Sequence, residues 1–180
     1  MEKRALVISP IAPYVVKPAH MAEPDDEGWY GQIVEILEEA EDGFYRIRTP
    51  YRYETYVHAS HLCLDEAEAE RWEKADLRRV WAAWADVQVE SGATHPHHIS
   101  LCRGAVVELV APPEKPQGWA KVRLIGGAEG FVREGFLGPY YENEPSAGEE
   151  ELRNSVVEAA KLYMGVQYRW GGKTPQGIDC

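Results

Sequence analysis

The sequence lacks long hydrophobic runs and clusters of basic residues. No apolar stretch among its 180 residues approaches the ~20 that a membrane-spanning helix needs. Lys and Arg total 19 against 30 Asp and Glu, which gives a formal net charge of −11, and the cations nowhere form a run. Nucleic acids and anionic membranes are bound by clustered cations. We therefore expect neither nucleic acid nor a membrane span.

Cysteine is also scarce. The three cysteines are Cys63, Cys102 and Cys180. Their odd number and their spacing match neither a disulfide framework nor a metal site. The N-terminus begins with basic residues, but Ser9, Pro10 and Pro13 interrupt the apolar stretch that a signal peptide would need. Free thiols and the missing export signal favour a cytoplasmic location, with secretion as the alternative.

What the sequence does contain is an internal repeat with an offset of about 75 residues, long enough for a small domain. Its copies are residues 31–62 and 104–137. Gly31 matches Gly104, and the pair Gly43-Phe44 matches Gly118-Trp119. Further matches join Glu54, Tyr56 and Val57 to Glu129, Phe131 and Val132. The repeat predicts two copies of one fold.

Both copies alternate apolar and polar residues with period two, as in Ala120, Val122 and Leu124 against their polar neighbours. Together with a run at Ala5–Ile8, this pattern predicts short, half-buried strands. Asp42-Gly43 and Gly126-Gly127 are turn dipeptides of the hairpin kind. Several short strands with such turns indicate a small barrel.

The strand motifs G-x-x-V-E-x-L, G-W-x-K-V and E-G-[FY]-V resemble those of bacterial SH3-like modules. The resemblance implies a first module over residues 1–64 and a second over residues 78–142. Residues 65–77 between them are acidic, Ala-rich and free of Gly and Pro. They predict a linking helix that is capped by Asp65 and presents its charges to solvent.

After residue 142 the pattern changes to helical spacing. Ser146 and Glu149 fit a capping box, and apolar residues then recur on one face. These residues are Leu152, Val156, Ala159, Ala160 and Tyr163. Gly165 is placed to end the helix. We expect an amphipathic helix over residues 147–164, followed by a turning segment that leads to Cys180.

Residues 165–180 read GVQYRWGGKTPQGIDC, and nine of these sixteen positions fit the motif G-x-x-Y-x-W-G-G followed by a Gly/Pro loop and an aliphatic-D-C triplet. This segment resembles the entry to NlpC-type papain-like cysteine peptidases. The resemblance implies that residues 147–180 begin such a domain, which is incomplete here. The expected fold class is mainly β, with two SH3-like barrels followed by the first helix and loop of an α+β papain-like domain.

In this resemblance Cys180 is the catalytic nucleophile. A thiol attacks a carbonyl as the thiolate, and a helix N-terminus following Cys180 would lower its pKa and offer N–H groups to the oxyanion. The alternative is a plain buried thiol. Trp170 is expected to be a packing anchor beneath the loop. The glycines allow close approach to substrate.

The resemblance also implies substrate-binding roles for two neighbours of Cys180. Tyr168 lies beside the nucleophile and holds the substrate or its oxyanion. Asp179 binds the free amino group of the substrate, which is physically sensible because a carboxylate and an ammonium offset each other's desolvation. The alternative is that Asp179 only caps the next helix.

In similar enzymes the first SH3-like module closes one end of the cleft and restricts cleavage to peptides with a free N-terminal L-Ala. Tyr53 matches a tyrosine that contributes there. The acidic residue expected after Tyr-Gly is replaced by Gln32, so amine recognition by this module needs a substitute. Glu27 and Glu54 are the nearby candidates, although such residues are more often ordinary surface or strand positions.

Histidines raise two further questions. His95, His97 and His98 lie near Cys102 but without a second ligand pair, so we expect no metal, and the resemblance implies no cofactor. A thiolate also needs a general base. All six histidines precede the position where the family's base would lie. We therefore expect further chain beyond Cys180 or a modified Cys180, with a truncated regulator as the third option.

The enzyme hypothesis is hydrolysis of the γ-D-glutamyl–diamino acid bond in muropeptides such as L-Ala-γ-D-Glu-diaminopimelate, through an acyl-thioester on Cys180. In the cytoplasm this would recycle peptidoglycan peptides. The rival hypothesis is a non-catalytic tandem SH3-like module that binds wall peptides or a partner protein. Loss of turnover in a Cys180→Ala variant separates the two.

Overall fold

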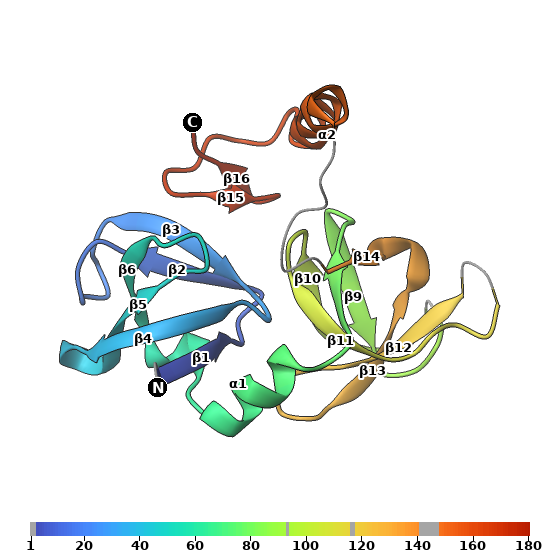
Figure 1. Ribbon diagram of the computed structural model, residues 1–180, viewed down its shortest axis with the longest axis horizontal. Helices are drawn as coiled ribbons and strands as arrows, with labels where there is room; N and C mark the ends of the chain where they lie inside the picture. The colour runs from blue at the N-terminus through green and yellow to red at the C-terminus, as the bar shows by residue number, and fades with distance from the viewer. Residues whose placement is uncertain (1–2, 93, 116–117, 141–147) are drawn as a thin grey trace.

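The computed structural model describes residues 3–92, 94–115, 118–140 and 148–180. Two seven-stranded antiparallel sheets make up most of it (Figure 1). The first contains β1 (Lys3–Val7), β2 (Ile11–Val15), β3 (Pro24–Trp29), β4 (Ile33–Glu39), β5 (Phe44–Arg48), β6 (Glu54–His58) and β7 (Leu62–Cys63). The second contains β8 (Leu77–Val80), β9 (Trp84–Gln88), β10 (His97–Cys102), β11 (Val106–Ala111), β12 (Trp119–Arg123), β13 (Glu129–Arg133) and β14 (Leu137–Pro139).

The two sheets share one topology. The strand order is β3-β2-β6-β5-β4-β1-β7 in the first and β10-β9-β13-β12-β11-β8-β14 in the second. Adding seven to each strand number converts one order into the other, so the sequence repeat is a repeat of fold. The mainly β class expected from the sequence is confirmed.

Alternation along the strands places the apolar faces inside, as expected. Ala120, Val122 and Leu124 are buried, and in the first sheet Val34 is 1% exposed. Both turn dipeptides form tight hairpins. Asp42 and Gly43 have φ of 54° and 75° in the 3₁₀ turn Glu41–Gly43, and Gly126 and Gly127 have φ of 85° and 93°. Positive φ at two successive residues suits the twist of a hairpin, and glycine adopts it at little cost.

The linking helix α1 (Glu66–Glu73) is capped as expected, since Asp65 Oδ1 accepts from the backbone N–H of Ala67 at 3.0 Å. Its role is larger than a solvated connection. Ala69 and Trp72 are 0% exposed and belong to the core shared with the second sheet. The Trp72 indole donates to the carbonyl of Gly31 at 3.1 Å. The helix therefore fills the junction between the two sheets.

A loop of the first module completes this junction. The Tyr30 carbonyl accepts from Val106 N at 2.8 Å, and the Tyr30 hydroxyl accepts from Ile125 N at 2.6 Å. A Cβ on Gly31 would lie 2.6 Å from the carbonyl oxygen of Val106, so only glycine fits. Leu6 joins the core cluster of the second sheet. The domain boundaries at residues 64, 77 and 142 stay predictions.

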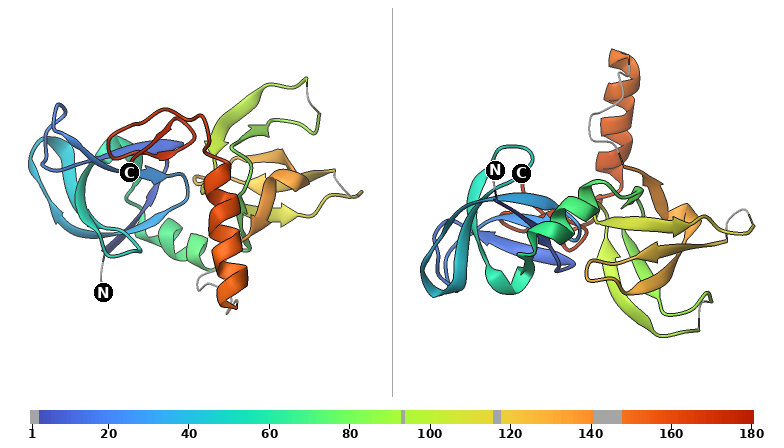
Figure 2. Two further views of the ribbon diagram at one scale, coloured as in Figure 1. Left: turned by 90° about the horizontal axis from the view of Figure 1, so that it is seen from above. Right: turned by 60° about the horizontal axis from the view of Figure 1, so that its bottom comes forward.

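The C-terminal part consists of α2 (Glu149–Lys161) and a short hairpin of β15 (Lys173–Thr174) and β16 (Gly177–Ile178). Helix α2 projects beyond the two barrels in one view of Figure 2, and residues at its C-terminal end, Leu162 and Tyr163, line a pocket of about 800 Å³ together with Trp81 and Arg103 of the second module. Gly148 occupies its N-cap, and Gly165 has φ of 84° beyond its end. Ser146 of the expected capping box and the first residue of the expected helix, residue 147, lie outside the described residues.

The apolar face expected for α2 is open to solvent only in part. Leu152 and Val156 are 47% and 59% exposed, whereas Tyr163 is partly buried. In the described residues, neither helix has the length and apolar character that crossing a bilayer requires. The two remaining 3₁₀ turns, η2 (Ala59–His61) and η3 (Glu134–Phe136), close the barrels before β7 and β14.

Candidate active site

The segment that ends at Cys180 folds back on itself over β3 (Figure 1). Tyr168 forms a parallel bridge with Ile178, and Arg169 N donates to the Ile178 carbonyl at 3.1 Å. Asp179 N donates to the Gly172 carbonyl at 2.7 Å. These backbone bonds bring residues eleven positions apart, Tyr168 and Asp179, into contact. The glycine-rich sequence thus builds a compact loop around Asp179.

Asp179 is the most densely hydrogen-bonded side chain of this loop. Its Oδ1 accepts from the Tyr168 hydroxyl at 2.8 Å and from Cys180 N at 2.7 Å, and its Oδ2 accepts from Gly171 N at 2.8 Å. Donors to a carboxylate favour its charged form. The Gly171 N–H, followed by Tyr168 and Cys180, therefore lowers the pKa of Asp179 to about 2.

The sign of this shift fixes its pH dependence. A carboxylate whose pKa is depressed on folding stabilises the loop above its unfolded pKa, and the contribution is lost as pH falls through about 2. At neutral pH Asp179 is therefore a fixed negative charge. The same hydrogen bond raises the pKa of the Tyr168 phenol to about 12, so that hydroxyl remains a donor.

Cys180 is exposed. By contrast Cys102 is 0% exposed, and burial raises its pKa to about 11. Hydrogen bonding to the adjacent Asp179 carboxylate raises the pKa of the Cys180 thiol. Asp179 therefore opposes thiolate formation, and a base is needed to deprotonate Cys180 for attack.

The histidines of the described residues belong to the two barrels. His20 packs on Phe44 and His58, and His61 shares a hydrogen bond with Ser9. In the second barrel His95 lies near Glu90, and His98 contacts the Glu129 carbonyl. Across the described ranges no hydrogen bond joins a histidine to Cys180. The described histidines thus lie apart from the loop that carries Cys180.

The first module presents an acidic edge strand to this loop. Asp25, Asp26 and Glu27 are consecutive in β3. Lys173 N donates to Glu27 Oε2 at 3.1 Å, and the Lys173 ammonium lies 2.9 Å from Asp26 Oδ1. A Cβ on Gly171, whose φ is 69°, would come within 3.1 Å of the Asp25 backbone. The loop is therefore in direct contact with all three acidic residues.

Tyr53 lies at this edge, as expected, but its partner was not foreseen. Its side chain is 44% exposed, and its hydroxyl donates to Asp25 Oδ1 at 2.6 Å. The Asp25 backbone packs against Gly171, whose N–H donates to Asp179. The first module therefore contacts the loop at the residue that holds Asp179.

Gln32 does not share that accessible position. It is 6% exposed, and its Oε1 accepts from the hydroxyl of Tyr14, which is itself 0% exposed. The neutral amide fits this interior because a carboxylate there would carry an unpaired buried charge. The structure therefore places Gln32 in the interior of the first barrel, beneath the acidic edge rather than on its surface.

The two candidates to replace an acidic residue at position 32 have different surroundings. Glu54 is held by Arg46 and Arg48 at 2.7 and 2.8 Å, away from the loop. Glu27 is 5% exposed and contacts Arg169 at 3.5 Å as well as Lys173 N. Both carboxylates already have cationic or N–H partners, so Asp25 is better placed to receive an amine.

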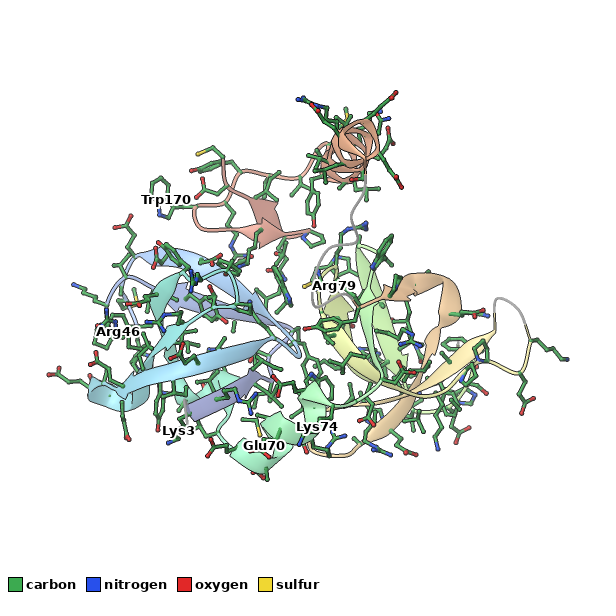
Figure 3. The ribbon with its side chains drawn as sticks, viewed as in Figure 1. Lys3, Arg46, Glu70, Lys74, Arg79 and Trp170 are labelled. Atoms are coloured by element: carbon green, nitrogen blue, oxygen red, sulfur yellow. The ribbon has the colours of Figure 1, made fainter. Side chains whose placement is uncertain are left out.

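Trp170 is a correction to the sequence interpretation. It was expected to pack beneath the loop, yet it is 55% exposed and extends outward from it (Figure 3). The anchor is Lys173 instead. Its ammonium lies 4.6 Å from the Trp29 ring centre and 4.5 Å from that of Tyr51, whose hydroxyl it also contacts.

Sequence reasoning missed Lys173, Asp25, Asp26 and Tyr51. The one sequence feature that could have indicated them is the run of three acidic residues at Asp25–Glu27, which lies in a segment predicted to be part of the first barrel. A cation that must pair with that run could lie anywhere in the chain, because Lys173 and Glu27 are 146 residues apart. The pairing is therefore visible only in three dimensions.

We expect Lys173→Met to loosen the loop. The variant removes an ammonium that pairs with Asp26 and lies over two rings, and burial already lowers its pKa. The side chains are 25% and 15% exposed, so the loss should be about 1–2 kcal/mol. Thermal unfolding and hydrogen exchange of residues 168–180 measure it.

Lys161→Met is the matched control, since its pair with Glu158 is 57% and 70% exposed and should contribute little. Equal effects of the two substitutions on melting temperature and on exchange would refute the anchoring role of Lys173.

Comparisons with known proteins agree with this architecture. No family model matches the chain. Dipeptidyl-peptidase 6 of Lysinibacillus sphaericus is 34% identical over 177 residues, which cover 98% of this chain and 65% of that protein. The chain thus spans slightly less than two thirds of that curated relative.

Two solved structures share the fold. An NlpC/P60 family protein from Bacillus cereus superposes with a TM-score of 0.74 at 14% identity, over 98% of this chain and 68% of that one. An NlpC/P60 endopeptidase from Photobacterium damselae subsp. piscicida gives 0.59 at 14% identity, over 99% and 40%. The arrangement of the chain is thus shared with these two structures. The chain is a homologue of dipeptidyl-peptidase 6 and has the fold of NlpC/P60 proteins.

Proposed function

We propose that this protein is a cysteine peptidase that hydrolyses the γ-D-glutamyl–diamino acid bond of peptidoglycan-derived peptides with a free N-terminal L-Ala. The observation that carries the proposal is the ionised Asp179, fixed by three donors beside the exposed Cys180. Homology to dipeptidyl-peptidase 6 supports the reaction class. Cys180 is the nucleophile in this proposal.

The reaction begins when a base takes the thiol proton of Cys180. The thiolate then attacks the γ-carbonyl carbon of D-Glu, and the C–N bond breaks as the diamino acid leaves with a proton on its nitrogen. Water hydrolyses the thioester and releases L-Ala-γ-D-Glu. The Tyr168 hydroxyl, held as a donor, is placed to support the substrate or its oxyanion.

Selection of a free amine follows from the charges around the loop. In the described ranges, the cations paired with the acids of β3 are Arg169, on Glu27, and Lys173, on Asp26, and Asp179 adds a further negative charge. This excess of negative charge attracts an ammonium group. Asp25, oriented by Tyr53, takes the role of the acidic residue that Gln32 replaces. In the same proposal the enzyme needs no metal or cofactor.

The test uses the full-length protein and compares peptides that have a free N-terminal amine with the same peptides after N-acetylation. L-Ala-γ-D-Glu-L-Lys and its diaminopimelate counterpart should yield the dipeptide and the free diamino acid, detected by mass spectrometry. N-acetylation of the L-Ala should lower kcat/KM by about 100-fold, since losing a paired charge costs roughly 2–5 kcal/mol. Equal cleavage of acetylated and free peptides would contradict amine recognition.

We place this activity in the cytoplasm, as recycling of wall peptides, with a secreted wall hydrolase as the alternative. The free thiols of Cys63 and Cys102 support the placement. Fractionation of the producing bacterium tests it. Recovery of the protein from the culture medium, with activity on intact wall, would contradict the cytoplasmic role.

A further inference from the structure

The second barrel carries a groove that the proposed reaction does not use. It encloses about 320 Å³ on the surface formed by β9, β12, β13 and η3. Its lining combines three aromatic rings with three polar side chains. These residues are Trp84, Asp86, Gln88, Trp119, Arg133 and Phe136.

The aromatic walls of this groove are open to solvent. Trp84 and Phe136 are 39% and 41% exposed, and Trp119 is partly exposed between them. Large aromatic side chains in water lose favourable burial, so a concave set of three is an unusual feature of a small barrel. Such walls suit alkyl groups of a ligand.

The first barrel provides an internal comparison. Trp119 pairs with Arg133 in the register in which Phe44 pairs with His58. In the first barrel His20 packs against both rings, at 5.2 Å from Phe44 and 4.9 Å from His58, and Phe44 is 3% exposed. The chain therefore fills this position itself in the first barrel and leaves it open in the second.

Two polar groups in the open groove have unsatisfied bonding capacity. The Arg133 guanidinium lies 4.3 Å from the Trp119 ring centre, and within the described ranges no carboxylate forms an ion pair with it. Gln88 is 8% exposed, and its Oε1 has no hydrogen-bond partner among the described residues. Because the last side-chain torsion of Gln is broad, a small rotation turns this oxygen toward the groove.

These groups define the chemistry of a ligand. Arg133 fits a free carboxylate, Gln88 Oε1 fits an amide N–H, and the rings fit small alkyl side chains. Asp86 is already bonded to the Ser100 hydroxyl at 2.6 Å. Arg133 gives this groove a positive charge in a chain of net charge −11, so an acidic ligand can bind here.

We propose that this groove is a second binding site for an extended wall peptide, with the peptide carboxylate on Arg133 and a peptide N–H on Gln88. The identity of the peptide rests on the proposed function, whereas the site does not involve Cys180. Binding here holds a peptide at the second barrel while the first barrel and the C-terminal loop receive the free N-terminus of a substrate.

The experiment measures binding of N-acetyl-L-Ala-γ-D-Glu-L-Lys to the full-length protein carrying Cys180→Ala, by calorimetry or tryptophan fluorescence. Acetylation removes the amine that the catalytic loop selects, so the groove remains as the binding site. Arg133→Gln and Trp84→Ala should each weaken binding by about tenfold or more. Arg153→Gln, an exposed arginine on α2, should leave it unchanged.

Gln88→Leu separates binding from stability. It removes the unpartnered amide oxygen, so the melting temperature should rise by a few degrees while the affinity falls. Equal affinity in all variants would overturn the proposal. So would groove binding of a proline-rich peptide or a chitin oligosaccharide with no binding of the wall peptide. Cleavage of free L-Ala peptides with no binding at the groove would overturn this inference and leave the proposed function standing.

Discussion

Cys180→Ala abolishes hydrolysis of L-Ala-γ-D-Glu-diamino acid peptides and leaves the fold intact. Removing the nucleophile leaves no group to form the thioester, so kcat should fall by about 10³-fold or more. Because Cys180 is exposed, its truncation creates no cavity, and the melting temperature should stay within about 1 °C of the parent. Product release is followed by mass spectrometry in the full-length protein.

The other two cysteines are the matched controls. Cys63 is partly buried and Cys102 is 0% exposed with a raised pKa, so Cys63→Ala and Cys102→Ala should keep the turnover number even where they lower stability. Undiminished hydrolysis by Cys180→Ala would refute the proposed mechanism. The tandem barrels would then be better described as a binding module.

Much of the barrel architecture follows from local pattern. Period-two alternation in residues 120–124 and the dipeptides Asp42-Gly43 and Gly126-Gly127 each depend on neighbours in sequence, so the strands and hairpins were predictable. The Asp65 cap depends on residues two or three positions away. The repeat then showed that two copies share one fold.

What could not be predicted depends on distant partners. The sequence indicates that α1 is charged, but Trp72 is buried because Gly31 and the second sheet meet it there. Trp170 is of a residue type that usually packs in the interior, yet it is exposed. Lys173 is of a type that usually lies on the surface, yet it anchors the loop against Trp29. Residue type alone does not determine burial when the covering surface comes from another module.

The candidate site divides in the same way. The Asp179-Cys180 pair and Tyr168 were found because a short motif contains them, and the structure brings them into contact. Tyr53 was found by its place in the module, but Asp25 was not, since nothing local links position 25 to position 171. Their roles remain predictions that substitution can test.

Asp179→Asn should change cleavage and thiol reactivity in opposite directions. Asparagine keeps an oxygen that can accept from Tyr168 and from Cys180 N, but its NH2 cannot accept from Gly171 N, so one of the three hydrogen bonds is lost. The negative charge is lost, and with it the attraction for the substrate ammonium. We expect kcat/KM for free L-Ala peptides to fall by about 100-fold, the scale of a lost charge-paired contact.

The reactivity of the Cys180 thiol should increase in the same variant. Since the Asp179 carboxylate raises the pKa of Cys180, neutralising it lowers that pKa and increases the thiolate fraction at pH 8. Alkylation of Cys180 by iodoacetamide should therefore be several-fold faster in Asp179→Asn than in the parent chain. Peptide mapping distinguishes Cys180 from Cys63.

Asp25→Asn is the companion variant, because the Asp25 backbone packs against Gly171 while its carboxylate accepts from Tyr53 rather than from Cys180. It should lower kcat/KM for free peptides without changing the alkylation rate. If Asp179 were only a helix cap, Asp179→Asn would lower cleavage of free and acetylated peptides by the same factor. A larger loss for the free peptide, combined with faster alkylation, assigns Asp179 two effects: it attracts the substrate amine, and it keeps the thiol protonated until a base acts.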